Sequence, residues 1–147
     1  MKIVFLGTIG IYHPILAAHL YLGRELNDDN SHLSGWGDFS QEDSGYPILV
    51  GQDSLGNQVY ALGAGIEVTM TRETIKQLVE ILGHSPDELL IKTISVQTEI
   101  ALIYLYRMAA FRILQKPINA VVARLLRPEY ASLQRQVDEF KAEARFS

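Results

Sequence analysis

Short runs of hydrophobic residues, each bounded by turn-forming residues, recur along this chain and predict β-strands. They cover residues 2–6, 47–52, 58–63, 89–95 and 118–126. The second and third runs lie on either side of a five-residue connection that contains glycine, a spacing typical of a β-hairpin. The last run contains Val121-Val122-Ala123, and we interpret it as a third parallel strand beside the first and fourth runs.

Other stretches repeat their apolar residues every three or four positions, which predicts helices with one buried face. They cover residues 14–22, 72–82 and 97–114, and a last helix begins at Pro128. Proline suits the first position of a helix, and Thr71 can cap the second one. The stretch 97–114 is the most apolar, but Arg107 and Arg112 interrupt it. Because it falls short of the ~20 apolar residues of a membrane span, we expect a buried helix and no membrane contact.

Strands and helices therefore follow one another in the order β-α-β-β-α-β-α-β-α. This alternation predicts an α/β fold, with three layers (α/β/α) around a mixed, mostly parallel sheet of about five strands. The hairpin is expected to be an insertion into that sheet. A length of 147 residues is ordinary for one domain, so residues 1–147 are expected to form a single α/β domain.

Charge is distributed unevenly around a net value of −4. Residues 25–88 carry twelve acidic and two basic side chains, whereas residues 89–147 carry nine basic and five acidic ones. The negative total gives nucleic acid no overall attraction, so no nucleic-acid partner is expected. This separation of charge is compatible with contacts between the acidic region 25–88 and the basic region 89–147. Such contacts can form within one chain or between chains, which leaves homo-oligomer formation open.

Several classes of chemistry are excluded by composition and spacing. The chain has no cysteine, which rules out disulfides, thiolate catalysis and Cys-ligated metal sites. The pair Gly7 and Gly10 forms neither a G-x-G-x-x-G nor a Walker A motif, and no H-E-x-x-H or G-x-S-x-G motif occurs. No metal site, cofactor or reaction is therefore predicted. The apolar start is too short for a signal peptide, so a cytoplasmic location is expected.

Ligands of open α/β sheets bind at the carboxyl ends of the strands, and three predicted strand ends carry suitable residues. They are Gly7, Thr8, Gly10, Tyr12 and His13; Thr93, Ser95 and Thr98; and Arg124 and Arg127. Backbone N–H groups, hydroxyls and guanidinium groups together suit a small anionic ligand, a phosphate or a carboxylate. The alternative is structural: the glycines form only a tight turn, His13 only packs, and Ser95 is only a helix cap.

The histidines differ in the role that their positions predict. His13 is the histidine at a predicted strand end, so it is the candidate acid–base group. His19 lies on the buried stripe of the first helix and is expected to be a paired core histidine. His32 lies in an acidic loop with Asp28, Asp29, Asp38, Glu42 and Asp43. Carboxylates in that loop could hold a hard cation, but their spacing fits no EF-hand, which favours a solvated acidic loop.

One segment carries a family resemblance. It reads Gly51-Gln52-Asp53-Ser54-Leu55-Gly56-Asn57-Gln58-Val59-Tyr60-Ala61-Leu62-Gly63. This hairpin resembles the G-x-D-x-x-G-N-x-V-Y-x-L-G hairpin of the uncharacterised bacterial proteins catalogued as domain of unknown function 3189. The stretches Asp38-Phe39, Glu42-Asp43-Ser44-Gly45 and Asp87-Glu88-Leu89-Leu90 are also similar. The family typically has Gly-Gly and then His-Ser-Ser in the first loop, where this chain has Ile9-Gly10-Ile11-Tyr12-His13-Pro14. The resemblance implies a fold and no assigned activity.

A second function class competes with ligand binding, namely a non-catalytic assembly or protein-interaction module. The last predicted helix repeats apolar residues at intervals of three and four, at Tyr130, Leu133, Val137, Phe140 and Ala144. This stripe is compatible with packing on the chain's own sheet or on a partner subunit. Its span of about two heptads favours the sheet.

Overall fold

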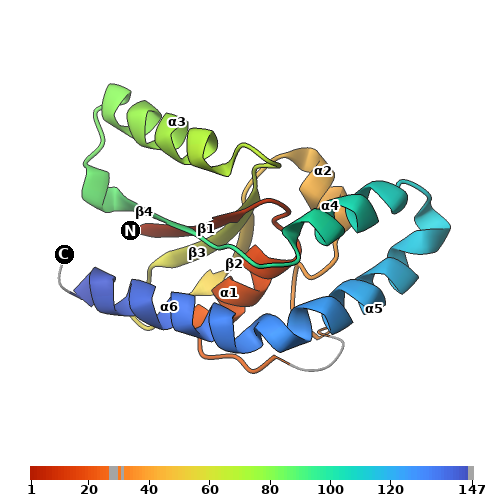
Figure 1. The fold of residues 1–147 in the computed structure, drawn as a ribbon. Coiled ribbons are helices and arrows are strands. Elements are labelled where there is room, and N and C mark those ends of the chain that lie inside the picture. The colour runs from red at the N-terminus through yellow and green to blue at the C-terminus, as the bar shows by residue number, and fades with distance from the viewer. Residues whose placement is uncertain (27–29, 31, 146–147) are drawn as a thin grey trace.

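A four-stranded mixed sheet forms the centre of the computed structural model, which describes residues 1–26, 30 and 32–145 (Figure 1). Its strands are β1 (Lys2–Gly7), β2 (Ile48–Gln52), β3 (Gln58–Gly63) and β4 (Leu89–Thr93), in the order β2-β3-β1-β4. β1 runs parallel to β3 and β4, and β2 runs antiparallel to β3. The sheet thus has four strands instead of about five. The β2–β3 hairpin supplies the antiparallel pair that makes the sheet mixed, as predicted, and β3 joins it to β1.

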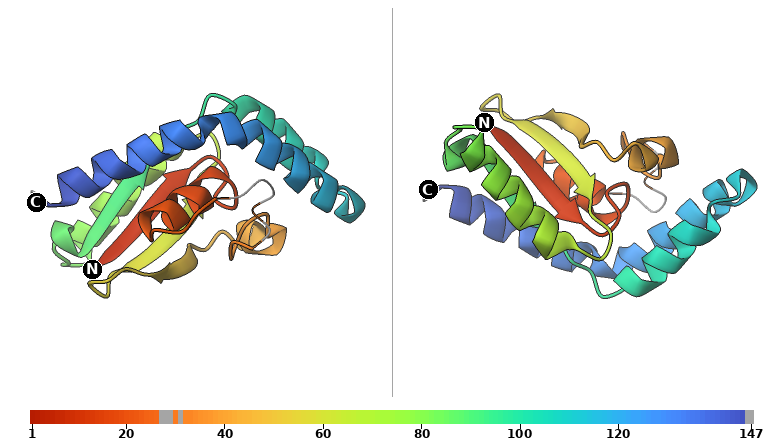
Figure 2. Two further views of the ribbon diagram at one scale, coloured as in Figure 1. Left: turned by 90° about the horizontal axis from the view of Figure 1, so that it is seen from below. Right: turned by 90° about the horizontal axis from the view of Figure 1, so that it is seen from above.

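Helices cover both faces of the sheet, which confirms the α/β class. They are α1 (His13–Tyr21), α2 (Phe39–Ser44), α3 (Val68–Ile81), α4 (Glu99–Met108), α5 (Gln115–Leu126) and α6 (Tyr130–Arg145). α1 and α6 lie on one face and α3 lies on the other, whereas α4 and α5 form a pair that projects beyond one end of the sheet (Figure 2). Short 3₁₀ turns occupy Pro86–Glu88, Arg112–Leu114 and Arg127–Glu129.

The predicted strand at residues 118–126 is wrong, because this segment forms most of helix α5. Ile118, Val122 and Leu126 are buried and lie four residues apart, whereas Val121 is 43% exposed. This period belongs to one face of a helix and not to a strand. Two adjacent β-branched residues carry a strand preference that packing outside the sheet overrides.

Other boundaries also move. α3 begins at Val68, so Thr71 lies inside the helix and does not cap it. The stretch 97–114 is divided into α4 and the 3₁₀ turn Arg112–Leu114. The long connection after α1 contains α2, which Asp38 caps by accepting a hydrogen bond from the Gln41 N–H.

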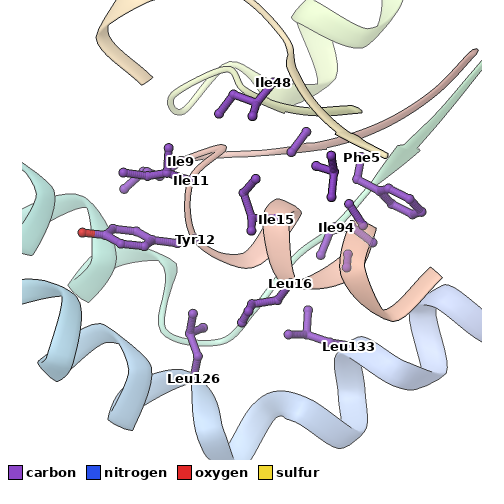
Figure 3. Packing of buried hydrophobic residues seen from close by; sticks show 14 of the residues in the cluster. Phe5, Ile9, Ile11, Tyr12, Ile15, Leu16, Ile48, Ile94, Leu126 and Leu133 are labelled. Atoms are coloured by element: carbon purple, nitrogen blue, oxygen red, sulfur yellow. The ribbon is translucent and has the colours of Figure 1, made fainter. Parts of the chain in front are cut away.

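Helix α1 is the centre of the core (Figure 3). All its residues from His13 to His19 are buried, as expected for a helix that is apolar on every side. It lies between the sheet and α6 (Figure 2). On α6, Leu133, Val137 and Phe140 are buried, and the Phe140 ring contacts the Phe5 ring edge-on at 5.5 Å. These three residues of the apolar stripe of α6 therefore pack within the chain.

No helix in the described residues is both long enough and apolar enough to cross a bilayer.

Candidate functional site

The three parallel strands end at one edge of the sheet. Gly7 at the end of β1 pairs with Gly63 at the end of β3, and Leu6 pairs with Thr93 at the end of β4. The loops after β1 and β4, which were predicted to form the site, are therefore neighbours. The third predicted strand end does not exist, so Arg124 lies on α5 and Arg127 in the following 3₁₀ turn, both with exposed side chains.

The loop after β1 holds an internal carboxylate. The Gly10 N–H donates to Oε1 of Glu42 at 3.2 Å, and the Ile11 backbone also bonds this side chain. Burial raises the pKa of Glu42, and the two backbone groups oppose that rise by stabilising the charged form. Glu42 comes from α2 and was not predicted as a site residue. The sequence had indicated it only as one of the carboxylates of the acidic loop and as part of the family-like stretch.

Gly10 and Gly63 leave space for this carboxylate because they have no Cβ atom. A Cβ atom added to Gly10 would lie 2.6 Å from the Gly63 nitrogen and 3.0 Å from Oε2 of Glu42. A Cβ atom on Gly63 would likewise collide with the Glu42 carboxylate and lie 2.6 Å from the Gly10 nitrogen. Neither glycine has a positive φ, so closeness and not backbone conformation requires glycine here.

His13 is completely buried at the start of α1. Neither ring nitrogen has a hydrogen-bond partner among the described residues, and Nε2 lies 3.6 Å from Oε1 of Glu99. Burial lowers the pKa of His13 to about 3, although the backbone of Ile94 opposes that shift. Burial also raises the pKa of Glu99. Burial thus disfavours the charged form of both members of this pair, which lies at the start of α1.

The side chain of Thr8 in the same loop is also buried without a partner. Its Oγ1 has no hydrogen bond among the described residues, whereas its carbonyl accepts from the Gly65 N–H at 3.0 Å. Buried hydroxyls are normally hydrogen-bonded. Thr8 and His13 together therefore leave three buried polar atoms of one loop without protein partners.

Tyr12 has a structural role. Its hydroxyl donates to Oδ1 of Asn119 at 3.0 Å, and Nδ2 of Asn119 donates to the Gly37 carbonyl at 3.2 Å. The Tyr12 ring packs against Trp36 at 5.4 Å. Burial raises the pKa of Tyr12 far above its ordinary value, so it stays neutral.

The loop after β4 is hydrogen-bonded to the 3₁₀ turn Arg127–Glu129 and to α6. Glu129 accepts from the Gln97 N–H and from Oγ1 of Thr98, the latter at 2.6 Å. Gln136 accepts from the Ser95 N–H at 3.1 Å and donates to the Ser95 carbonyl at 2.8 Å. These two partners were not predicted, because they follow the loop by more than thirty residues. Thr98 is consequently engaged within the protein.

A polar pocket of about 930 Å³ opens beside this loop. Thr93 and Ser95 line it, together with Lys92, Ser132 and Arg135. The predicted hydroxyls of Thr93 and Ser95 thus line a cavity that contains two cationic side chains and also two acidic ones, Glu129 and Glu139. Neither of the predicted arginines, Arg124 and Arg127, lines it. The cations come from β4 and α6.

The remaining histidine predictions differ in outcome. His19 is paired as expected, with the Ser34 carbonyl at 3.0 Å from Nε2 and Nη1 of Arg24 at 2.9 Å from Nδ1. Asp28 and Asp29 of the acidic loop lie outside the described residues. Elsewhere in the described chain, no three His, Asp or Glu side chains are grouped so that they could hold a metal ion.

Comparisons with known proteins add a family and no activity. The family described as "Protein of unknown function (DUF3189)" matches residues 2–142. No curated protein and no solved structure matches the chain.

Proposed function

Since the chain belongs to the DUF3189 family, whose description assigns no activity, we propose a function from the geometry alone: the protein binds a small anionic ligand, a phosphate or a carboxylate, at the carboxyl ends of the parallel strands. The observation that carries this proposal is the carboxylate of Glu42 bound to the backbone of Gly10 and Ile11. Convergent N–H groups of a loop recognise an anion, and here they already bind one that belongs to the protein.

The rest of the loop supplies donors for a ligand. The Thr8 hydroxyl and the neutral His13 imidazole can each donate one hydrogen bond, and both are buried. Donors in a water-excluded site interact more strongly with a charge than donors in water. We therefore infer that an external anion replaces Glu42 and gains the hydrogen bonds that Glu42 does not make.

The cationic side chains beside β4 provide a second point of attachment. Lys92 and Arg135 line the pocket with Thr93 and Ser95, and guanidinium and ammonium groups bind phosphate or carboxylate oxygens well. A ligand with two anionic groups would fit both loops.

Removal of the competing carboxylate tests the proposal. We expect Glu42→Ala to bind inorganic phosphate or acetate about tenfold more tightly than the unmodified protein, because the ligand no longer displaces an internal anion. At saturating ligand, the ligand should therefore stabilise Glu42→Ala by about 1.4 kcal/mol more than it stabilises the unmodified protein. The ligand-induced rise in Tm should be larger by ~3 °C in the variant. Thermal unfolding with increasing phosphate, acetate or chloride measures it, with chloride as the control for ionic strength.

Glu80→Ala is the matched control, because Glu80 is exposed on α3 and the substitution changes the net charge equally. It should leave the ligand-dependent rise in Tm unchanged. The proposal is contradicted if neither phosphate nor acetate stabilises Glu42→Ala beyond chloride. Equal gains in the two variants would show a nonspecific effect of charge and would also contradict it.

A further inference from the structure

The strand β4 has a free edge. The sheet order places β4 at one end, where it pairs only with β1 among the described residues (Figure 1). In a parallel ladder, successive residues turn their N–H and C=O groups to opposite sides of the strand. Because the Ile94 N–H donates to the Leu6 carbonyl at 2.8 Å, the backbone groups of Ile91 and Thr93 point away from β1. They are available to another strand.

A groove runs along this edge. It has a volume of about 540 Å³ and is lined by five residues of β4, from Leu89 to Thr93. Helix α3 lines it with Arg72 and Lys76, and helix α6 lines it with Phe140 and Glu143. These helices lie on opposite faces of the sheet, so the groove has a wall on each side of the strand.

The groove is cationic. Arg72, Lys76 and Lys92 line it against one acid, Glu143, and none of the three cations forms a salt bridge within the described chain. The Nε atom of Arg72 is buried and has no hydrogen-bond acceptor there. A buried guanidinium N–H without a partner is costly, and a carboxylate is the acceptor that matches its geometry best.

We propose that this edge binds an extended acidic peptide segment of a partner protein, which adds a strand beside β4. The peptide backbone pairs with Ile91 and Thr93, and its carboxylates bind Arg72, Lys76 and Lys92. Strand addition to a sheet edge obtains affinity from main-chain hydrogen bonds and specificity from side chains at alternate positions. This groove is separate from the Glu42 loop, although it shares Lys92 and Thr93 with the polar pocket beside β4. Arg72 and Lys76 line only the groove, so their substitution tests this proposal without altering the anion site.

Fluorescence anisotropy with a labelled octapeptide of alternating valine and glutamate tests the proposal. We expect the peptide to bind, and a peptide with lysine in place of glutamate to bind at least tenfold more weakly. The double variant R72Q/K76Q should also weaken binding by about tenfold, since charged hydrogen bonds at partly buried sites have effects of this size. The double variant R112Q/K116Q, which changes the net charge equally on exposed residues outside the groove, should bind as the unmodified protein does.

A methylated peptide tests whether the bound peptide pairs with β4 as a strand. The same acidic peptide methylated at its central backbone nitrogens keeps its charge but loses its donors, so its binding should be lost. Hydrogen exchange of the Ile91 and Thr93 amides should slow when the unmethylated peptide is bound. Equal binding of the methylated peptide, or equal binding by R72Q/K76Q and R112Q/K116Q, overturns the proposal. So does a peptide-free dimer that R72Q/K76Q dissociates, because a second copy would then occupy the edge.

Discussion

Replacement of Gly63 by alanine is expected to lower the free energy of unfolding by about 3 kcal/mol, the upper range for overpacking a core position. The added methyl group would collide with the Glu42 carboxylate and lie 2.6 Å from the Gly10 nitrogen. The carboxylate can move away, but the Gly10 backbone is fixed between β1 and α1. Strands β1 and β3 would therefore have to separate at the end of the sheet where Gly7 pairs with Gly63. Urea unfolding followed by circular dichroism measures the effect.

Gly51→Ala is the matched control for this prediction. Gly51 is also a strand glycine without a positive φ, and its added Cβ would meet only the flexible ends of Leu22 and Arg24, at 3.0 and 3.1 Å. A loss below about 1 kcal/mol is expected there, because these side chains can rotate away. The double variant G63A/E42A should keep most of the loss of G63A, since the backbone contact remains. Similar losses for Gly51→Ala and Gly63→Ala would refute the explanation by close approach.

The second large effect is a dependence of stability on pH that His13 controls. Burial lowers the pKa of His13 from 6.5 to about 3 in the folded chain. As the pH falls below about 6.5, the unfolded chain binds a proton that the folded chain does not. Stability is therefore complete above that pH and falls by about 1.4 kcal/mol per pH unit toward pH 3. Urea unfolding between pH 4 and pH 8 measures this slope.

Other groups contribute to the slope and must be subtracted. The raised pKa values of Glu42 and Glu99 act in the opposite sense, because the folded chain retains protons that the unfolded chain has released. The lowered pKa of His19 acts in the same sense as that of His13. The difference between the unmodified protein and His13→Gln isolates His13. Thr8→Val alters the same loop without removing a titratable group, so it should keep the slope. A slope unchanged in His13→Gln would disprove the assignment.

Sequence patterns predicted the fold well where local and tertiary preferences agree. The β1 run, the hairpin and the first helix are clear because apolar periodicity and turn residues coincide there. They fail at residues 118–126, where Val121 and Val122 carry a strand preference but the buried positions are spaced four apart. Two adjacent β-branched residues cannot show whether they lie in a sheet or on a helix. The packing of Ile118, Val122 and Leu126 determines that choice.

The site was predicted only in part. The predicted strand ends of the loop from Gly7 to His13 and of Thr93 and Ser95 do lie next to each other, because parallel strands end together. The prediction that Arg124 and Arg127 belong to the same site depended on a strand at residues 118–126, and this segment is part of helix α5. Lys92 and Arg135 line the cavity beside Thr93 and Ser95 instead, and no local pattern indicates which side of β4 or α6 faces that cavity.

The sequence by itself determined the class of fold, the absence of cysteine chemistry and the strand end at which a ligand is expected. These depend on residue type and on short-range spacing. Only the tertiary structure showed that Glu42 fills the loop of Gly10 and that Glu129 occupies the donors of Gln97 and Thr98. Each of these contacts joins residues more than thirty positions apart. Such contacts follow from the closure of the chain around its core, since no local propensity encodes the partner of a buried polar group.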